Sequence, residues 1–243
     1  MSARRVLVFG GTGSIGLAIC RRLAADGDEL VVADLGDRGH LISDLPGEGH
    51  TFASCDVGDL ESVRAVAAAC TDITAVVSAV GINYTGPVAE TDWSMYERMQ
   101  RVNLQGAFHI AAACEESCSP DAYVFLASVA GLTGEAGGAV YCSTKFGLIG
   151  FVQSFAAEIA ARGARANTVC PGNVDSPLLR DLAAAVAERE GTSAEAMLDR
   201  FAGDSAFRRL ITVDEVAEAV AFLASRRSSG ISGQSLVVDG APN

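Results

Sequence analysis

Short apolar runs alternate with longer stretches of helical periodicity along almost the whole chain of 243 residues. In the longer stretches, apolar residues recur three and four positions apart, as on one face of a helix. The runs predicted as strands are residues 4–9, 29–33, 50–54, 74–80, 123–127, 164–169 and 235–238. The stretches predicted as helices are residues 14–26, 60–70, 93–114 (one long helix or two), 141–161 and 213–224. Strands separated by helices predict an α/β fold, a doubly wound parallel sheet with helices on both faces.

We expect a single domain over residues 1–243, because the chain has no internal repeat and no linker rich in Pro, Gly or Ser. Residues 178–210 break the alternation: they are helical and amphipathic and lie between a strand and the next helix. Such an insertion is typical of a lid, so we expect a helical substrate lid there. Thr192 and Thr212 each stand three residues before a glutamate, the capping-box spacing that begins a helix.

The chain is acidic, with 30 Asp and Glu against 18 Lys and Arg and a net charge of −12. Such a surface repels phosphate backbones and anionic lipid heads, so we expect no nucleic-acid or membrane partner. Seven cysteines, an odd number without a Cys-x-x-Cys pair, favour reduced thiols and a cytoplasmic location. Three histidines show no metal-ligand spacing, so we expect no metal.

A glycine-rich segment, residues 10–16, joins the first predicted strand to the first predicted helix. Glycines there allow a tight turn and the close approach of backbone N–H groups to a pyrophosphate at the helix N-terminus. A plain turn also needs glycine, but the strand–loop–helix context favours a Rossmann-type dinucleotide site. The cofactor-binding residues expected in this segment are Gly10, Thr12, Gly13, Ser14, Ile15 and Gly16.

Asp34 ends the second predicted strand, 18 residues after Gly16, near the place of a carboxylate that binds a ribose 2′-hydroxyl. A carboxylate there repels a 2′-phosphate and favours NAD over NADP, although Arg38 is near in sequence and keeps NADP open. The alternative for Asp34 is a solvated turn residue. Asp56, with Val57 beside it, follows the third predicted strand and is expected to contact the adenine, or else to cap the next helix.

Tyr141 and Lys145 open a predicted helix four residues apart, so they share one helix face. Lys145 is the only lysine among the 18 basic residues, in a chain that otherwise uses arginine. A nearby cation favours phenolate, which predicts a lowered Tyr141 pKa and a general acid/base. A boundary tyrosine beside a surface lysine is the alternative. Ser128 follows the strand predicted over residues 123–127, at the ligand side of a parallel sheet, where a turn-forming serine is the other interpretation.

Together, the glycine segment, Ser128, Tyr141-x-x-x-Lys145 and Pro171-Gly172 resemble the short-chain dehydrogenase/reductase family, in its compact single-domain branch. The resemblance covers essentially the whole chain. It implies that Tyr141 is the general acid/base, that Ser128 hydrogen-bonds the substrate oxygen and that Lys145 holds the nicotinamide ribose.

Further site residues come from this resemblance. Asn103 matches the asparagine that orders a water on the proton relay, the alternative being an asparagine that disrupts a helix. The remaining residues expected to contact the cofactor are Gly81, Pro171, Gly172, Val174 and Ser176. Two positions at the glycine segment depart from the compact branch. Phe9, just before the segment, replaces a threonine, and Ser14 replaces a glycine, so the glycine spacing is closer to the extended branch.

The activity so implied is hydride transfer between NAD(H) and a small secondary alcohol or ketone. The lid region is similar to those of NAD-linked polyol and sugar-alcohol dehydrogenases and not far from those of 3-oxoacyl reductases. Two alternatives stay open: an NADP-dependent 3-oxoacyl or polyketide ketoreductase, and a non-catalytic dinucleotide-sensing protein. We also expect a homotetramer, because helices 93–114 and 141–161 carry surplus apolar and small residues. The residues proposed for that contact are Ala111, Ala112, Ala113, Phe151, Phe155 and Ala156.

Overall fold

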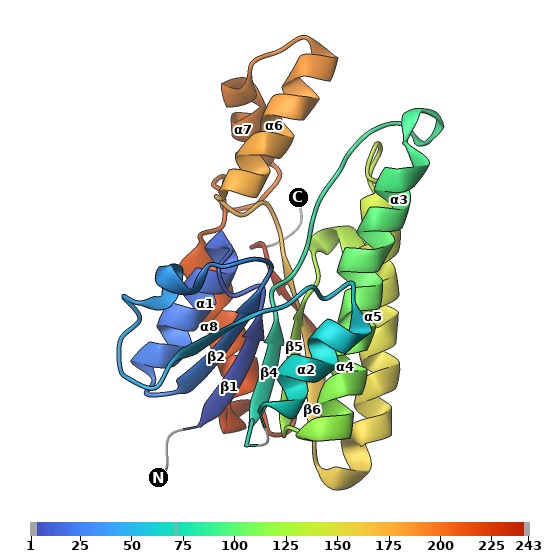
Figure 1. The fold of residues 1–243 in the computed structure, drawn as a ribbon. Coiled ribbons are helices and arrows are strands. Elements are labelled where there is room, and N and C mark those ends of the chain that lie inside the picture. The colour runs from blue at the N-terminus through green and yellow to red at the C-terminus, as the bar shows by residue number, and fades with distance from the viewer. Residues whose placement is uncertain (1–3, 71, 241–243) are drawn as a thin grey trace.

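A single parallel sheet forms the centre of the protein in the computed structural model, which describes residues 4–70 and 72–240 (Figure 1). Its order is β3-β2-β1-β4-β5-β6-β7. The strands are β1 (Arg5–Phe9), β2 (Glu29–Asp34), β3 (Thr51–Ser54), β4 (Ala75–Ser78), β5 (Ala122–Leu126), β6 (Arg165–Pro171) and β7 (Ser235–Val238). Every pairing between neighbours is parallel. The predicted doubly wound α/β fold is confirmed.

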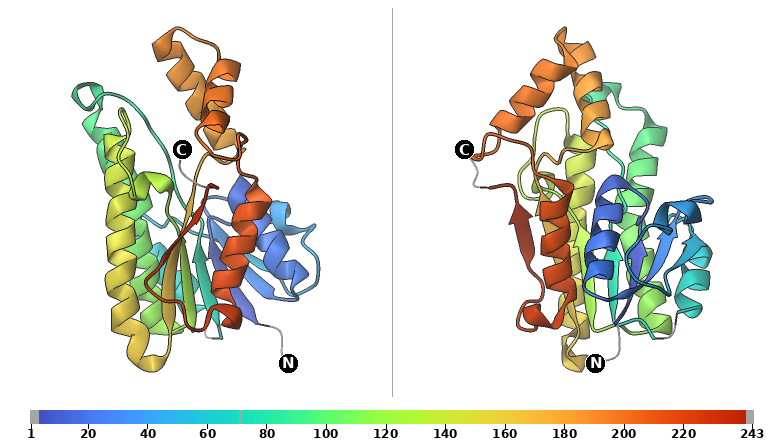
Figure 2. Two further views of the ribbon diagram at one scale, coloured as in Figure 1. Left: turned by 180° about the vertical axis from the view of Figure 1, so that it is seen from behind. Right: turned by 90° about the vertical axis from the view of Figure 1, so that its left-hand side faces the viewer.

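Helices cover both faces of the sheet (Figure 2). The α-helices are α1 (Ser14–Ala25), α2 (Leu60–Ala68), α3 (Trp93–Met99), α4 (Gly106–Ser117), α5 (Ala139–Ile159), α6 (Pro177–Glu190), α7 (Ala194–Gly203) and α8 (Val213–Ala224). Short 3-10 turns are η1 (Gly39–Ile42), η2 (Val88–Glu90), η4 (Val129–Gly131), η5 (Ala160–Arg162) and η6 (Arg226–Ser228). Helices α1 and α8 pack on one face, and α2, α4 and α5 pack on the other.

Strand β1 illustrates why the predicted strands are almost continuously apolar. Val6 and Val8 belong to the core under α1 and α8, whereas Leu7 and Phe9 belong to the core under α2, α4 and α5. Successive side chains point to opposite faces of a strand, and here both faces are covered. All four side chains are fully buried.

The helices match the predicted stretches, with ends that differ by a few residues. The stretch predicted over residues 93–114 is α3 and α4 joined by a π-helical segment, Gln100–Gln105. The capping box at Thr212 is confirmed, with reciprocal bonds between Thr212 and Glu215. The prediction at Thr192 is wrong: the N-cap of α7 is Ser193, whose hydroxyl accepts from the Ala196 N–H at 3.1 Å. The hydroxyl of Ser193, one residue after Thr192, is the one that lies close enough to the first turn of α7 to cap it.

The sheet order reverses between β1 and β4, where the chain crosses from one half of the sheet to the other. The loops after these two strands lie against each other at the carboxyl edge: a Cβ on Gly10 would come 2.9 Å from the carbonyl carbon of Ala79. In open α/β sheets, ligands bind in the crevice at this point. The fold therefore places the glycine segment beside the loop that follows β4.

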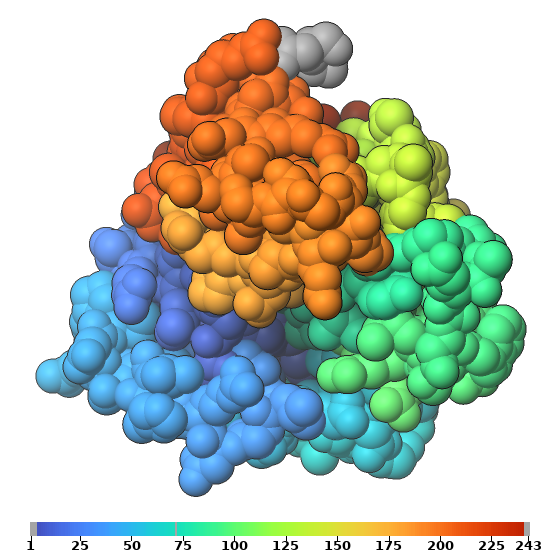
Figure 3. All heavy atoms as spheres, turned by 90° about the horizontal axis from the view of Figure 1, so that it is seen from above, coloured from blue at the N-terminus to red at the C-terminus, as the bar shows by residue number. Residues whose placement is uncertain are grey.

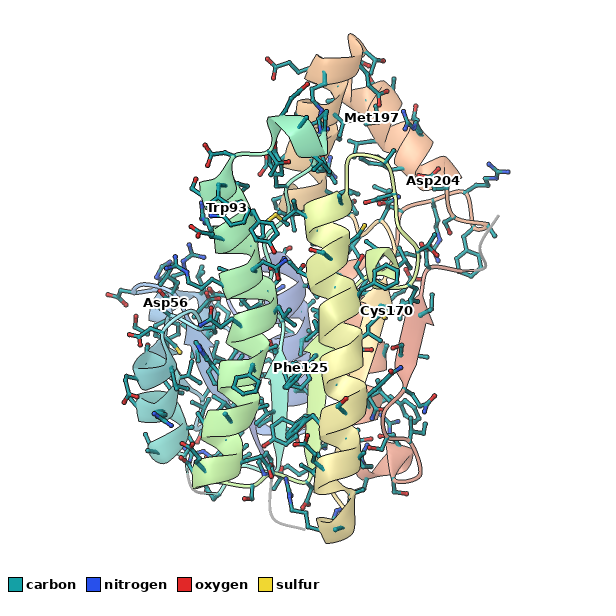
Figure 4. The ribbon with its side chains drawn as sticks, turned by 90° about the vertical axis from the view of Figure 1, so that its right-hand side faces the viewer. Asp56, Trp93, Phe125, Cys170, Met197 and Asp204 are labelled. Atoms are coloured by element: carbon teal, nitrogen blue, oxygen red, sulfur yellow. The ribbon has the colours of Figure 1, made fainter. Side chains whose placement is uncertain are left out.

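Helices α6 and α7 form a hairpin that stands above the carboxyl ends of the strands (Figure 1). The hairpin has a small core of its own, in which Met197 packs with Ala183 and Ala187 (Figure 4). A parallel bridge between Val174 and Ile211 joins the segment that enters the hairpin to the segment that leaves it. The guanidinium of Arg189 on α6 reaches across to Thr85, donating to its carbonyl and to its hydroxyl, the latter at 2.8 Å.

The residues proposed for subunit contacts mostly lie inside the chain's own core. Ala111, Ala113, Phe155 and Ala156 are buried between α4, α5 and the sheet, so that part of the interface prediction is wrong. Sheet-facing small residues and outward-facing ones share the same helical stretch, and periodicity alone did not separate them. The exposed apolar side chains of this face are instead Phe108 and Phe146, 58% and 46% exposed.

Candidate active site

The glycine segment is shaped so that side chains do not fit at two of its glycines. Gly10 has φ +74°, in the left-handed region, and a Cβ on Gly16 would come 2.1 Å from the Gly10 carbonyl oxygen. Gly13 is the N-cap of α1 and supplies no side-chain acceptor to the first-turn N–H groups. These groups, with the helix dipole, suit an anion such as a pyrophosphate. The other positions of the segment are Gly11, Thr12, Ser14 and Ile15.

Asp34 lies at the end of β2 beside this segment. Its Oδ2 accepts from the Thr12 N–H at 2.9 Å and from the Thr12 hydroxyl at 2.5 Å, and its Oδ1 accepts from the Leu35 N–H at 2.8 Å. These contacts fix the carboxylate next to the glycine segment. A freely solvated turn residue, the alternative raised from the sequence, would not be held in this way.

Asp56 follows β3 at the same edge of the sheet (Figure 4). Its Oδ1 accepts from the Gly58 N–H at 2.8 Å. The N-cap of α2 is Asp59, so the alternative that Asp56 caps this helix is wrong. Val57 is buried, and its carbonyl lies 2.8 Å from Nδ1 of His109 on α4.

Tyr141 and Lys145 lie one turn apart in the first part of α5. The Lys145 ammonium is 5.6 Å from the centroid of the Tyr141 ring and donates to the Leu126 carbonyl oxygen at the end of β5, at 2.9 Å. Lys145 is only 3% exposed, which rules out the surface-lysine alternative. A Cβ on Gly81 would come 3.4 Å from Nζ, so the loop after β4 also closes on this ammonium.

The pKa values of the pair differ from the sequence expectation. Burial raises the pKa of Tyr141 to about 12, against a smaller lowering by a hydrogen bond with Ser128. Burial lowers the pKa of Lys145 to about 8. The predicted lowering of the Tyr141 pKa is therefore wrong for the chain by itself, because desolvation of the phenolate outweighs the effect of Ser128. At neutral pH, Tyr141 carries its proton.

Ser128 follows β5 and begins the turn η4, where its hydroxyl also accepts from the Ala130 N–H at 3.2 Å. The turn role considered from the sequence is thus real, but it coexists with the bond to Tyr141. Asn103 lies in the π-helical segment and is 2% exposed. Its amide pairs with both backbone groups of Ile82, each at 2.9 Å, and donates to the Thr144 hydroxyl at 3.2 Å. Asn103 therefore ties the loop after β4 to α5.

The segment after β6 forms another wall of the site. A Cβ on Gly172 would come 1.7 Å from Oδ1 of Asp239, so only glycine fits there. Ser176 is buried and caps α6, accepting from the Leu179 N–H at 3.3 Å. Its hydroxyl thus has a structural role in addition to the expected cofactor contact.

Many of the predicted site residues line one cavity of about 410 Å³. It lies under the α6–α7 hairpin, beside the hollow seen from above in Figure 3. Predicted residues that line it are Ile15, Gly81, Ser128, Tyr141, Lys145, Pro171, Gly172, Val174 and Ser176. Predicted residues that do not line it are Gly10, Thr12, Gly13, Ser14, Gly16, Asp34, Asp56, Val57 and Asn103. The first set would surround the reacting end of a bound cofactor, whereas most of the second lies where its phosphate and adenosine parts are expected.

Sequence reasoning missed several side chains of this cavity. They are Asn83, Thr85, Glu135, Leu182, Val186, Arg189, Arg200 and Phe201. They lie on the loop after β4 and the loop before α5, which have no periodic pattern, and on the hairpin, whose periodic pattern does not show which face covers the cavity. Over residues 4–70 and 72–240, no group of three or more His, Cys, Asp or Glu is placed to hold a metal, and no helix is long and apolar enough to cross a membrane.

The glycine segment lies where the strand order of the parallel sheet reverses, and Ser128, Tyr141 and Lys145 lie beside it. Together these features define a dinucleotide-dependent oxidoreductase fold. A family model described as enoyl-(acyl carrier protein) reductase matches residues 10–241. The chain belongs to the short-chain dehydrogenase/reductase family, whose members named among its relatives act on alcohol or ketone groups.

Two relatives and one solved structure illustrate the range of proteins to which the chain is similar. An uncharacterized short-chain type dehydrogenase/reductase of Sinorhizobium fredii is 34% identical over 98% of this chain, which spans only 43% of that protein. The 3-oxoacyl-[acyl-carrier-protein] reductase MabA of Mycobacterium tuberculosis is 33% identical, over 98% of this chain and 92% of its own. The crystal structure of an actinorhodin polyketide ketoreductase variant with NADPH has a TM-score of 0.93 at 27% identity, covering 98% of this chain and 96% of that one.

Proposed function

We propose that the protein transfers a hydride between NAD(H) and a secondary alcohol or its ketone, with Tyr141 as general acid/base. The observation that carries the proposal is the convergence of Ser128, Tyr141 and Lys145 on one cavity beside the glycine segment. NAD, when bound, supplies or accepts the hydride at C4 of its nicotinamide. The residues of this chain supply the proton and the orientation.

Ketone reduction uses Tyr141 in the protonation state that it holds at neutral pH. Ser128, which hydrogen-bonds Tyr141, orients the substrate oxygen toward the phenol. The phenol proton passes to that oxygen as the hydride reaches the carbonyl carbon, which leaves a neutral alcohol and a phenolate. The Lys145 ammonium, 5.6 Å from the ring centroid, stabilises this phenolate. Alcohol oxidation runs the same steps backward and is favoured by high pH.

For the cofactor, the residues present fit a dinucleotide. Gly10 and Gly16 leave the backbone bare where a pyrophosphate would approach, and the first turn of α1 has no side-chain cap. Asp34, which Thr12 holds beside the glycine segment, would accept from a ribose 2′-hydroxyl and repel a 2′-phosphate. We therefore propose NAD. The second candidate is an NADP-dependent 3-oxoacyl or polyketide ketoreductase, which the named relative and the solved structure with NADPH favour.

Lid, assembly and location complete the proposal. Residues 178–210 would act as the substrate lid of the domain 1–243, because α6 lines the cavity and Arg189 bridges it to Thr85. A homotetramer would use the exposed face of α4 and α5, where Phe108 and Phe151 line a groove. A cytoplasmic location agrees with seven cysteines that are all free thiols.

A panel of alcohols and ketones, followed by NADH and NADPH absorbance in parallel, tests the proposal. We expect turnover with NADH at a higher kcat/KM than with NADPH. Higher efficiency with NADPH would favour the second candidate, and the absence of turnover with either cofactor would favour a non-catalytic dinucleotide-sensing protein.

A further inference from the structure

The first turn of α5 carries Tyr141 and has no side-chain cap. Gly138, the N-cap residue, makes no side-chain hydrogen bond to the N–H groups of that turn. Helix ends without such a cap fray more readily. The backbone of the proposed general acid/base therefore depends on another contact to hold it.

Thr144 supplies a contact of this kind, between the amide of Asn103 and the backbone of Tyr141. The π-helical segment that contains Asn103 lies beside α5 (Figure 4). The Thr144 hydroxyl accepts from Nδ2 of Asn103 at 3.2 Å and donates to the Tyr141 carbonyl at 2.7 Å. Because an amide nitrogen only donates, the hydroxyl proton is directed to the carbonyl. Thr144 is fully buried, so solvent does not compete for either bond.

Asn103 connects this hydroxyl to the loop after β4. Both backbone polar groups of Ile82 bond the Asn103 amide at 2.9 Å, and its bond to Thr144 completes the amide's hydrogen bonding. The same loop closes on the ammonium of Lys145: a Cβ on Gly81 would come 3.4 Å from Nζ and 3.7 Å from Oδ1 of Asn103. Through Thr144, the loop after β4 is therefore joined to the beginning of α5.

The neighbouring hydroxyl, that of Ser143, shows what is particular to Thr144. Ser143 also donates to a carbonyl three residues earlier, that of Val140 at 2.7 Å, and it accepts from Nε2 of Gln100 at 3.0 Å. Ser143 is exposed, however, so water can take the place of either bond. The two hydroxyls share a local pattern and differ in burial, which makes Ser143 a matched control.

We propose that Thr144 is a positioning residue for hydride transfer, whose hydroxyl holds Tyr141 and Lys145 in register with the loop after β4. The inference rests on the proposed function and adds to it a residue that does not line the cavity. Loss of the hydroxyl leaves one N–H of Asn103 buried and unpaired, so the loop and the first turn of α5 move apart or loosen. Because a displacement of about 1 Å near the reacting atoms costs roughly a hundredfold in rate, a smaller displacement still slows the chemical step.

The test compares variants of Thr144 in the NADH-dependent reduction of the panel ketone that has the highest wild-type kcat/KM. Thr144→Val keeps the shape and removes the hydroxyl, so kcat should fall at least about tenfold while the KM of the ketone changes less than about twofold. Thr144→Ser keeps the hydroxyl and removes the methyl group, so kcat should stay within about threefold of the wild type. Thr144→Ala and Thr144→Ser, which differ by the hydroxyl alone, provide the same comparison if Thr144→Val does not fold.

Ser143→Ala removes the exposed hydroxyl and should keep kcat within about twofold of the wild type. Wild-type kcat in Thr144→Val, or equal kcat in Thr144→Ala and Thr144→Ser, would overturn the inference. An equal loss in Thr144→Ser and Thr144→Val would overturn it as well, because packing of the methyl group would then be the cause. So would an equal loss in Ser143→Ala, which would assign the effect to hydroxyl–carbonyl bonds of this helix in general. A wild type that turns over no member of the panel would instead overturn the proposed function.

Discussion

Replacing Lys145 by arginine changes the shape of the buried cation and keeps its charge. Lys145 is 3% exposed, bonds the Leu126 carbonyl and lies where even a methyl group on Gly81 would come within 3.4 Å of Nζ. A planar guanidinium is bulkier than the ammonium and would extend into the cavity that Lys145 lines, where it would displace the group bound there. Displacement of about 1 Å near the reacting atoms costs roughly a hundredfold in rate. We therefore expect Lys145→Arg to lose at least about that factor in kcat.

Lys145→Met separates catalysis from stability. The pKa of Lys145, lowered from 10.5 to about 8, means that the folded protein binds this proton less well than the unfolded chain does. The cost is fully present below pH 8 and disappears as the pH rises to 10.5, and it amounts to about 3 kcal/mol. In Lys145→Met, loss of the hydrogen bond to the Leu126 carbonyl offsets part of this gain in stability. Methionine leaves that carbonyl unpaired, which costs about 1–3 kcal/mol.

Urea unfolding at pH 7 and pH 10, together with steady-state kinetics, measures both effects. Wild-type stability relative to Lys145→Met should rise between these pH values by about 2–3 kcal/mol, while Lys145→Met lacks activity at both. Arg64→Lys, an exchange at an exposed ion pair, should change neither quantity. Near-wild-type kcat in Lys145→Arg would refute the reasoning, as would a stability difference that does not change with pH.

Two other predictions concern cofactor choice and assembly. Asp34→Ala removes the carboxylate held by Thr12 and should raise kcat/KM with NADPH relative to NADH at least about tenfold, or about 1.4 kcal/mol; a wild type that already prefers NADPH would show that Asp34 has another role. Light scattering at micromolar concentration should give a tetramer, and Phe108→Glu on the exposed face of α4 should reduce it to smaller species; a monomeric wild type would contradict the assembly proposal.

The sequence was sufficient to predict the sheet, because strands buried on both faces are apolar throughout and helices between them keep a regular period. The positions of Ser128, Tyr141 and Lys145 could also be predicted from the sequence. Ser128 follows a strand end, and Tyr141 and Lys145 are an i,i+4 pair on one helix face. The Tyr141 pKa was predicted in the wrong direction, because the opposing effect is desolvation, which depends on how the lid and loops pack. Glu135 and Asn83 were missed for the same reason: they lie on loops, and only tertiary structure brings them to the cavity.

The most direct test of hydride transfer with Tyr141 as proton donor is the reduction of an accepted ketone by NADH carrying two deuterium atoms at C4. Mass spectrometry of the alcohol should show one deuterium on the carbinol carbon with the wild type. Tyr141→Phe should bind NADH, as followed by its fluorescence, yet form this product at least about a hundredfold more slowly. An alcohol without deuterium, or an unimpaired Tyr141→Phe, would contradict the account.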